Sequence, residues 1–165
     1  MQAADLVFSR RVRQNHALEH ATVTLLTRDN QRLSVSARST ARGFTIYADL
    51  DPHTVRAASE EALQRLRNGE ASLAIHPNCG TNLAVGTSVM MIGSMVGLNA
   101  LRVRTRVASA IASSFAGFAM ARPLGQFLQR HVTTSAQVRD LRIVDVVQKR
   151  LLGRTVVEVQ TAIAL

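Results

Sequence analysis

The sequence predicts an α+β fold: a small mixed helix/strand head with a two-helix transmembrane hairpin inserted before a C-terminal β-hairpin. Three observations predict it. Helical and alternating patterns fill the first seventy-six residues, a run of twenty-five residues from Pro77 to Leu101 has no formal charge, and two Val/Ile-rich segments close the chain. Mixed runs of helices and strands favour α+β over a doubly wound sheet. We therefore expect an N-terminal α/β head at 1–76, the hairpin at 77–130, and C-terminal strands returning to the head at 131–165.

The N-terminal segment has the spacing of a helix, followed by a β-hairpin. Residues 3–28 are predicted to be helical because one stripe recurs every three to four residues. This stripe consists of Val12, His16, Glu19, His20, Val23 and Thr27. Two alternating segments follow, one at Leu33, Val35 and Ala37 and one at Phe44, Ile46 and Ala48. A Ser-Thr-Ala-Arg-Gly turn between them indicates a pair of antiparallel strands.

A second helix and a short strand complete the N-terminal head. Asp51 before Pro52 is typical of a helix N-cap followed by proline at the first helical position. The apolar face of this helix comprises Val55, Ala58, Ala62, Leu63 and Leu66. Glu61 can pair with Arg65 one turn later, and Gly69 is expected to end the helix. The segment Ser72–His76 is predicted to be a short strand.

Two apolar segments predict the membrane hairpin, with helices at about 82–101 and 107–128. Roughly 20 predominantly apolar residues cross a bilayer, and the first segment is apolar all round. The second reaches spanning length if it continues through Pro123, with the Arg122 head group reaching the interface. Small residues recur at helix-packing intervals: Gly86, Gly93, Gly97, Ser109, Ser113 and Gly117. The alternative is a buried helical pair in a soluble core, but 165 residues offer little protein to enclose it.

The chain ends in two predicted strands, Leu141–Val147 and Thr155–Thr161, which are separated by a Leu-Gly-Arg turn. Valine and isoleucine are enriched in both segments, as is typical of strands. We expect these strands to return to the N-terminal sheet.

The composition narrows the choice of partners and of compartment. Arginine supplies most of the 20 basic residues, and the net charge of +9 favours the lipid bilayer and its anionic lipids, or nucleic acid. Nucleic acid is the weaker option because base-stacking side chains are few: five Phe, one Tyr and no Trp. A homo-oligomer or a membrane-protein partner is also compatible with the sequence. One cysteine gives no internal disulfide.

The direction of insertion is open to two interpretations. The basic connection at 102–106 favours a cytoplasmic loop, whereas Arg122 and Arg130 flank the opposite end. The N-terminus lacks the basic-then-apolar order of a signal peptide. We therefore expect cytoplasmic termini and a cytoplasmic head.

Two short segments predict a metal site. His16-Ala-Leu-Glu19-His20 places two imidazoles one helical turn apart, with a carboxylate beside them. The turn Ile75–Asn82 supplies His76 and Cys79. Zinc takes imidazole and thiolate ligands in tetrahedral geometry, so His16, His20 and Cys79 would leave one position open, and His76 would close it. An open position permits hydrolysis with Glu19 as general base, whereas a closed site is structural.

Each of these residues also has a plainer interpretation. The two helical histidines can be polar residues packed under the sheet, with Glu19 paired to an arginine such as Arg13. Cys79 can be a small buried hydrophobe. In the turn, Asn78 or Gly80 can adopt the left-handed conformation, and Thr81 or Asn82 can cap the following helix. His53 and His131 are expected at the surface, and Arg10, Arg11 and Arg13 as a solvated or lipid-facing patch.

Two resemblances add to this interpretation. His16-Ala-Leu-Glu19-His20 is similar to the signature of the inverzincin (pitrilysin-like) metallopeptidases, which implies zinc-binding histidines and a glutamate base. That family takes a distal glutamate as third ligand, and this chain has no glutamate between Glu70 and Glu158.

More of the chain resembles a family of uncharacterised bacterial membrane proteins. The shared features are N-H-A-L-E-H-A-T at 15–22, G-F-x-I-Y at 43–47 and H-P-N-C-G-T-N at 76–82, followed by two apolar helices. This resemblance implies an integral protein of the bacterial inner membrane and supports the architecture without an activity.

The sequence therefore predicts a small integral membrane protein with a transition-metal site, most simply zinc. Whether it is an enzyme stays open. One alternative is a metal-dependent hydrolase of a peptide or other acyl bond, and the other is a non-catalytic membrane accessory or scaffold protein with a structural His/Cys cluster. An arginine-rich nucleic-acid-binding module is the third and weakest option.

Overall fold

The computed structural model describes residues 9–28, 33–77, 79–100, 103–151 and 153–164. Residues 3–8 of the predicted first helix, Asn78 of the turn, and Arg102 lie outside this part of the chain. The described residues form two compact units: a head, made of the segments up to residue 76 and from residue 130, and a helical hairpin at 77–129. The mixed helix/strand class, with two apolar helices and a C-terminal antiparallel β-hairpin, is confirmed.

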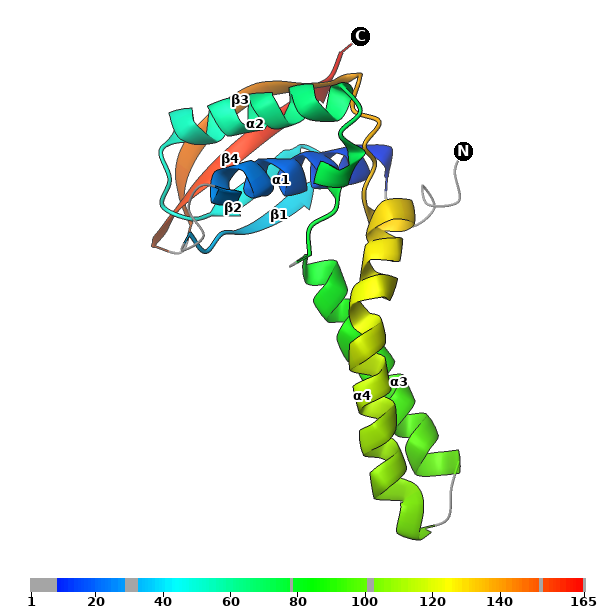
Figure 1. Ribbon diagram of the computed structural model, residues 1–165. Coiled ribbons are helices and arrows are strands. Elements are labelled where there is room, and N and C mark those ends of the chain that lie inside the picture. The colour runs from blue at the N-terminus through cyan, green and yellow to red at the C-terminus, as the bar shows by residue number, and fades with distance from the viewer. Residues whose placement is uncertain (1–8, 29–32, 78, 101–102, 152, 165) are drawn as a thin grey trace. The chain divides into compact units, whose positions relative to one another are not determined.

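The described residues of the head form two α-helices, two short helical turns and four strands. In chain order these are α1 (Arg10–Arg28), β1 (Ser36–Thr40), β2 (Gly43–Tyr47), α2 (Pro52–Arg67), the 3-10 turn η2 (Ala71–Ala74), the end of the π-helical turn η3 (Gln129–Thr133), β3 (Leu141–Leu151) and β4 (Arg154–Ile163). The sheet has the order β1-β2-β4-β3, and every neighbouring pair is antiparallel. The C-terminal hairpin thus joins the N-terminal one through β2 and β4 (Figure 1).

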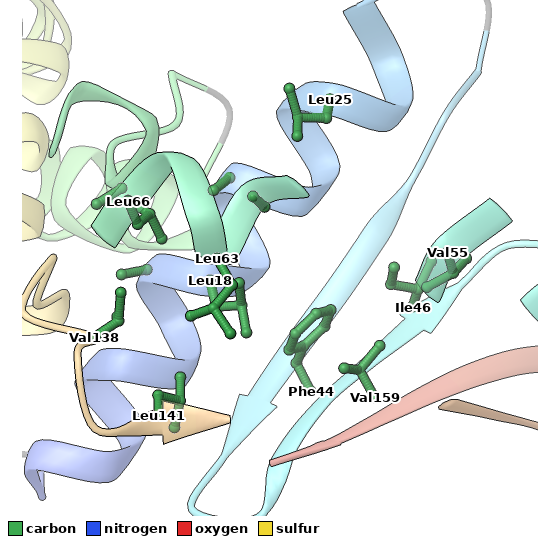
Figure 2. Packing of buried hydrophobic residues seen from close by; sticks show 14 of the residues in the cluster. Leu18, Leu25, Phe44, Ile46, Val55, Leu63, Leu66, Val138, Leu141 and Val159 are labelled. Carbon is green, nitrogen blue, oxygen red and sulfur yellow. The ribbon is translucent and has the colours of Figure 1, made fainter. Parts of the chain in front are cut away.

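The core of the head lies between the sheet and the helices α1 and α2. Inward residues of the strands alternate with outward ones, so that Phe44 and Ile46 of β2 and Val159 of β4 point to the same face. Leu18 from α1 and Leu63 from α2 meet this face (Figure 2). The predicted alternation of the second strand is therefore confirmed, and it fixes which side of the sheet the helices cover.

The predicted ends of α2 are also confirmed. Asp51 precedes the helix, and its carboxylate accepts a hydrogen bond from the Thr54 N–H at 3.1 Å. Glu61 and Arg65 form an ion pair at 3.5 Å. Gly69, just beyond the helix, has a φ of +97°, which glycine adopts at least cost.

Three sequence predictions for the head need correction. The segment Ser72–His76 is not a strand, because Ala71–Ala74 forms a 3-10 turn. The main-chain carbonyl of Ala74 accepts a hydrogen bond from a side chain of α1 instead of a strand. The stripe predicted for α1 is too narrow, since every residue from Arg13 to Val23 is buried except the half-buried His16. This helix is enclosed on more than one side.

The third correction concerns the arginines in the first turns of this helix. Arg13 is 5% exposed, so it does not belong to a solvated or lipid-facing patch. Its guanidinium donates to the carbonyls of His131 and Thr134, both at 3.4 Å. Arg10 forms an exposed ion pair with Asp140 at 3.2 Å.

The hairpin unit consists of α3 (Gly80–Ala100) and α4 (Val103–Leu128), which lie side by side (Figure 1). The predicted small residues lie at their contact. A Cβ placed on Gly93 would come within 2.9 Å of the Ser113 carbonyl oxygen, and one on Gly117 within 3.0 Å of the Met90 nitrogen. The hydroxyls of Ser94 and Ser114 hydrogen-bond across the helices at 2.6 Å. Close helix packing through small residues is therefore confirmed.

The outer surface of this hairpin is apolar. Two helical segments, Gly80–Asn99 and Arg106–Thr133, are long and apolar enough to cross a membrane. Only 17% and 11% of the residues in their most apolar windows are buried, whereas a core helix of a soluble protein is mostly buried. Large apolar side chains are exposed on both helices: Leu83, Met91, Ile92, Met95, Val96, Leu98, Val107, Ile111, Phe115, Phe118, Met120 and Phe127.

Candidate metal centre

Two histidines on α1 form the centre of the candidate site. His16 and His20 lie one turn apart, so both side chains leave the helix on the same side. Their ring centroids are 4.3 Å apart, and the ring planes meet at 64°. Two imidazoles at this separation can direct one nitrogen each toward a common point.

The orientation of each ring is set by a main-chain carbonyl. Nδ1 of His16 lies 3.0 Å from the Thr133 oxygen, and Nδ1 of His20 lies 2.8 Å from the Ala74 oxygen. A carbonyl oxygen only accepts, so Nδ1 must carry the proton in both rings. In the neutral imidazole the lone pair is then on Nε2, which is the arrangement found in histidines that bind metals.

His76 extends the cluster. Its ring centroid lies 5.9 Å from that of His20. Burial lowers the pKa of His76 from its usual value, because the charged ring loses hydration. The neutral form of this imidazole, which is the form that binds a metal ion, is thereby favoured.

Cys79 lies at the start of α3, where the chain enters the hairpin unit. Its carbonyl accepts from the Asn82 N–H at 2.9 Å, and its Sγ accepts from the Thr81 N–H at 3.4 Å. The helix begins at Gly80, so Cys79 directly precedes its first turn, and Thr81 and Asn82 lie within that turn. The Cys79 Sγ also donates to the Thr81 hydroxyl at 3.4 Å, so both of these contacts of the sulfur are to Thr81.

Glu19 lies beside the histidine pair and is only 7% exposed. Its carboxylate accepts a hydrogen bond from the hydroxyl of Ser39 on β1. Burial raises the pKa of Glu19, and this effect outweighs the hydrogen bond from Ser39 and the charge of His16, which both act to lower the pKa. A carboxyl group whose pKa lies above its usual value is suited to proton transfer.

The raised pKa of Glu19 leads to a testable pH dependence. The folded protein binds the Glu19 proton more tightly than the unfolded chain, so the associated stability is present below about pH 4.5 and is lost as the pH rises through the folded-state pKa. In chelator-treated protein, Glu19→Gln should therefore match the wild type at acidic pH and exceed its free energy of unfolding at neutral pH. Chemical denaturation followed by circular dichroism measures this difference.

The exposed Glu60 on α2 supplies the control for this experiment. Glu60→Gln should leave the difference between acidic and neutral pH unchanged. Equal pH dependence of the wild type and Glu19→Gln would show that burial does not raise the pKa of Glu19.

Sequence reasoning missed several residues that hold the site in place. The carbonyls of Ala74 and Thr133 could not be identified from the sequence, because every residue type offers a main-chain carbonyl. Ser39 could have been identified, because it is a polar residue at an inward position of an alternating strand. Asn15 also fixes the site helix, since its side chain donates to the Thr40 carbonyl at 2.8 Å and accepts from the Thr161 hydroxyl at 2.7 Å. The predicted surface histidines His53 and His131 are exposed.

The fold and these residues define a class of protein with an α+β head carrying a histidine pair and a hairpin of two apolar helices. The chain belongs to the family described as a domain of unknown function, DUF6391, whose model matches residues 11–146. This agrees with the expected membership of an uncharacterised family.

A relative in Picosynechococcus sp., described as an uncharacterised protein, is 35% identical over 136 residues. The similarity covers 75% of this chain and 66% of that protein, so the chain spans slightly less than two thirds of the relative's length. No solved structure matches the chain.

Proposed function

We propose that this is an integral membrane protein that binds one transition-metal ion, preferably zinc, through His16, His20 and Cys79. His76 serves either as the fourth ligand of the metal ion or as a neighbour that contacts the residues that bind it. The observation that carries the proposal is the pair of Nδ1–carbonyl hydrogen bonds, which leave Nε2 as the basic nitrogen of both helical histidines. Two imidazoles that are already oriented bind a metal ion with higher affinity than two mobile ones, because less side-chain conformational entropy is lost on binding.

The chain itself supports Cys79 as the third ligand. Cys79 follows His76 by three residues, and three residues span at most about 11 Å. Because the His76 ring is 5.9 Å from the His20 ring, the thiol is tethered near the histidines. Histidine, histidine and cysteine together are a ligand group suited to one metal ion. The mixture of imidazole nitrogen and thiolate sulfur favours zinc over the oxygen-seeking calcium and magnesium.

Insertion of the hairpin into a bilayer is the second part of the proposal. The apolar surfaces of α3 and α4 would be covered by lipid, and the net charge of +9 favours anionic head groups next to it. We place the protein in the bacterial inner membrane with the head in the cytoplasm. Homo-oligomers or membrane-protein partners are compatible with this placement, and nucleic acid is not a favoured partner.

Metal content tests the proposal directly. Protein purified in detergent should contain about one zinc ion per chain by elemental analysis. His16→Ala, His20→Ala and Cys79→Ser should each lose most of it, since removing one ligand leaves an incomplete coordination shell. His53→Ala, an exposed histidine on α2, should retain the wild-type content. Circular dichroism separates loss of metal from loss of fold.

Absence of any bound metal in the wild type would refute the proposed site. Equal metal content in Cys79→Ser and the wild type would instead remove the thiol from the ligand set. The single cysteine makes this substitution unambiguous.

Glu19 distinguishes the two forms of this function. In a metal-dependent hydrolase, Glu19 would act as general base toward a metal-bound water, and Glu19→Gln would keep the metal but abolish hydrolysis of an acyl bond. In a non-catalytic accessory protein, the same substitution would change neither metal content nor the attachment of the head to the hairpin. The hydrogen bond from Ser39 holds the carboxylate against β1, which favours the non-catalytic form.

A further inference from the structure

The side chain of Asn82 joins the start of α3 to Gln129, the residue directly after α4. Asn82 is the last residue of the H-P-N-C-G-T-N turn and is 8% exposed. Its Nδ2 donates to the Pro77 carbonyl at 2.7 Å, and its Oδ1 accepts from Nε2 of Gln129 at 2.7 Å. Gln129 is fully buried. A buried amide with both ends paired is a strong determinant of local geometry, because breaking either bond leaves a desolvated polar group.

A close approach of α4 holds this amide in place. A Cβ added to Gly125 would lie 2.1 Å from Oδ1 of Asn82 and 3.0 Å from its Cα. A side chain at position 125 would therefore have to push the Asn82 amide aside.

The same residue closes the turn that carries the thiol. The Asn82 side chain binds the carbonyl of Pro77, and the Asn82 main-chain N–H binds the carbonyl of Cys79 at 2.9 Å. These two bonds tie the carbonyls of Pro77 and Cys79 to the first turn of α3. Cys79 Sγ itself contacts Thr81: it accepts from the Thr81 N–H and donates to the Thr81 hydroxyl, both at 3.4 Å. Asn82 therefore acts on the thiol through the main chain of the turn.

We propose that Asn82 is a positioning residue that holds the Cys79 thiolate in the direction required for metal binding. This inference rests on the proposed function and extends it to a residue that need not touch the ion. Both polar ends of the amide are used. Aspartate at this position could still accept from Gln129 but would place a carboxylate oxygen against the Pro77 carbonyl, so the turn would lose its donor.

Cobalt(II) replaces zinc in the test because its spectrum reports the ligands. In full-length protein in detergent, Asn82→Asp should weaken cobalt affinity about 10–100-fold, the usual effect of losing a group that orients a ligand. The sulfur-to-cobalt charge-transfer band should fall more than the d–d bands, because the thiolate is misdirected while the histidines remain. A merely structural defect would reduce both in proportion.

Asn99→Asp is the matched control. Asn99 lies on the same helix, is exposed, and donates to the Met95 carbonyl of its own helix at 2.7 Å. This variant should give the wild-type affinity and spectrum. Gly125→Ala is the second test variant: its methyl group displaces the Asn82 amide without changing its chemistry, and should reproduce the loss of the charge-transfer band.

Alkylation of the thiol without metal separates the two proposals. The rate of reaction of Cys79 with iodoacetamide should change several-fold in Asn82→Asp and not in Asn99→Asp. If the wild type gives no cobalt spectrum, the proposed function fails and the alkylation rates alone decide the role of Asn82. If the wild type binds cobalt and Asn82→Asp shows the same affinity, spectrum and alkylation rate, the positioning role is overturned.

Discussion

Gly43→Ala is expected to lower the free energy of unfolding of the head by about 3–5 kcal/mol, since backbone strain and overpacking each cost a few kcal/mol. Gly43 begins β2 with a φ of +142°, a conformation that side-chain-bearing residues rarely adopt. A Cβ there would lie 1.9 Å from the Val159 carbonyl oxygen of β4. Because the obstructing atom belongs to the main chain, β2 and β4 would have to separate.

Gly153→Ala separates the conformational strain from the steric clash. Gly153 also has a positive φ, +78°, but nothing lies within 4 Å of the position that a Cβ would take there. We expect a loss of about 1 kcal/mol at this position, from strain alone. Thermal and chemical denaturation of full-length protein in detergent give both values, and similar losses for the two glycines would contradict the clash at Gly43.

Gly97→Leu is expected to disrupt the packing of the helical hairpin. A Cβ on Gly97 would lie 2.9 Å from main-chain atoms of Ser109 and Ala110, so a leucine would push α3 and α4 apart. We expect a cost of at least about 1–3 kcal/mol, the usual range for overpacking. Gly80→Leu, on the same helix with open space around its Cα, should pack without change.

Disulfide crosslinking measures this effect without full unfolding. The hydroxyls of Ser94 and Ser114 are 2.6 Å apart, so Ser94→Cys with Ser114→Cys, in a Cys79→Ser background, should form an intramolecular disulfide in full-length protein in detergent. Adding Gly97→Leu should remove most of the crosslink, whereas adding Gly80→Leu should not. A crosslink that survives Gly97→Leu would show that the helices do not depend on this close approach.

Local signals predicted most elements of the fold correctly. Asp51 and Pro52 specify the start of α2 through hydrogen bonds within a few residues, so neighbouring sequence was sufficient. The alternation around Phe44 and Ile46 indicated a strand because one face of the sheet is buried. The uncharged segments indicated long apolar helices because composition and length, both of which are visible in the sequence, are sufficient to identify them.

Long-range contacts account for the predictions that failed. Ser72–His76 has a strand-like composition, but the Ala74 carbonyl is taken by His20, which lies fifty-four residues earlier in the chain. Arg13 belongs by charge to a surface patch, yet it donates to carbonyls more than one hundred residues away. No periodicity in the sequence reports such partners.

The candidate site shows the same division. The helical spacing of His16 and His20 was sufficient to predict that their rings lie together, and the 4.3 Å separation bears this out. The tautomer of each ring was not predictable, because it depends on which carbonyl the fold brings to Nδ1. The role of Asn82 was open in the sequence, since asparagine in a turn has several uses.

The two carbonyls bound by the histidines lie close in the sequence to the two ends of the helical hairpin. Ala74 lies six residues before α3 begins, and Thr133 lies five residues after α4 ends. The polypeptide therefore leaves the head and re-enters it at points held by adjacent rings of α1. A metal ion that immobilises the rings of His16 and His20 would restrict the motion of the chain at both Ala74 and Thr133, and loss of the ion would release both segments. Limited proteolysis of these two segments would therefore report whether the ion is bound.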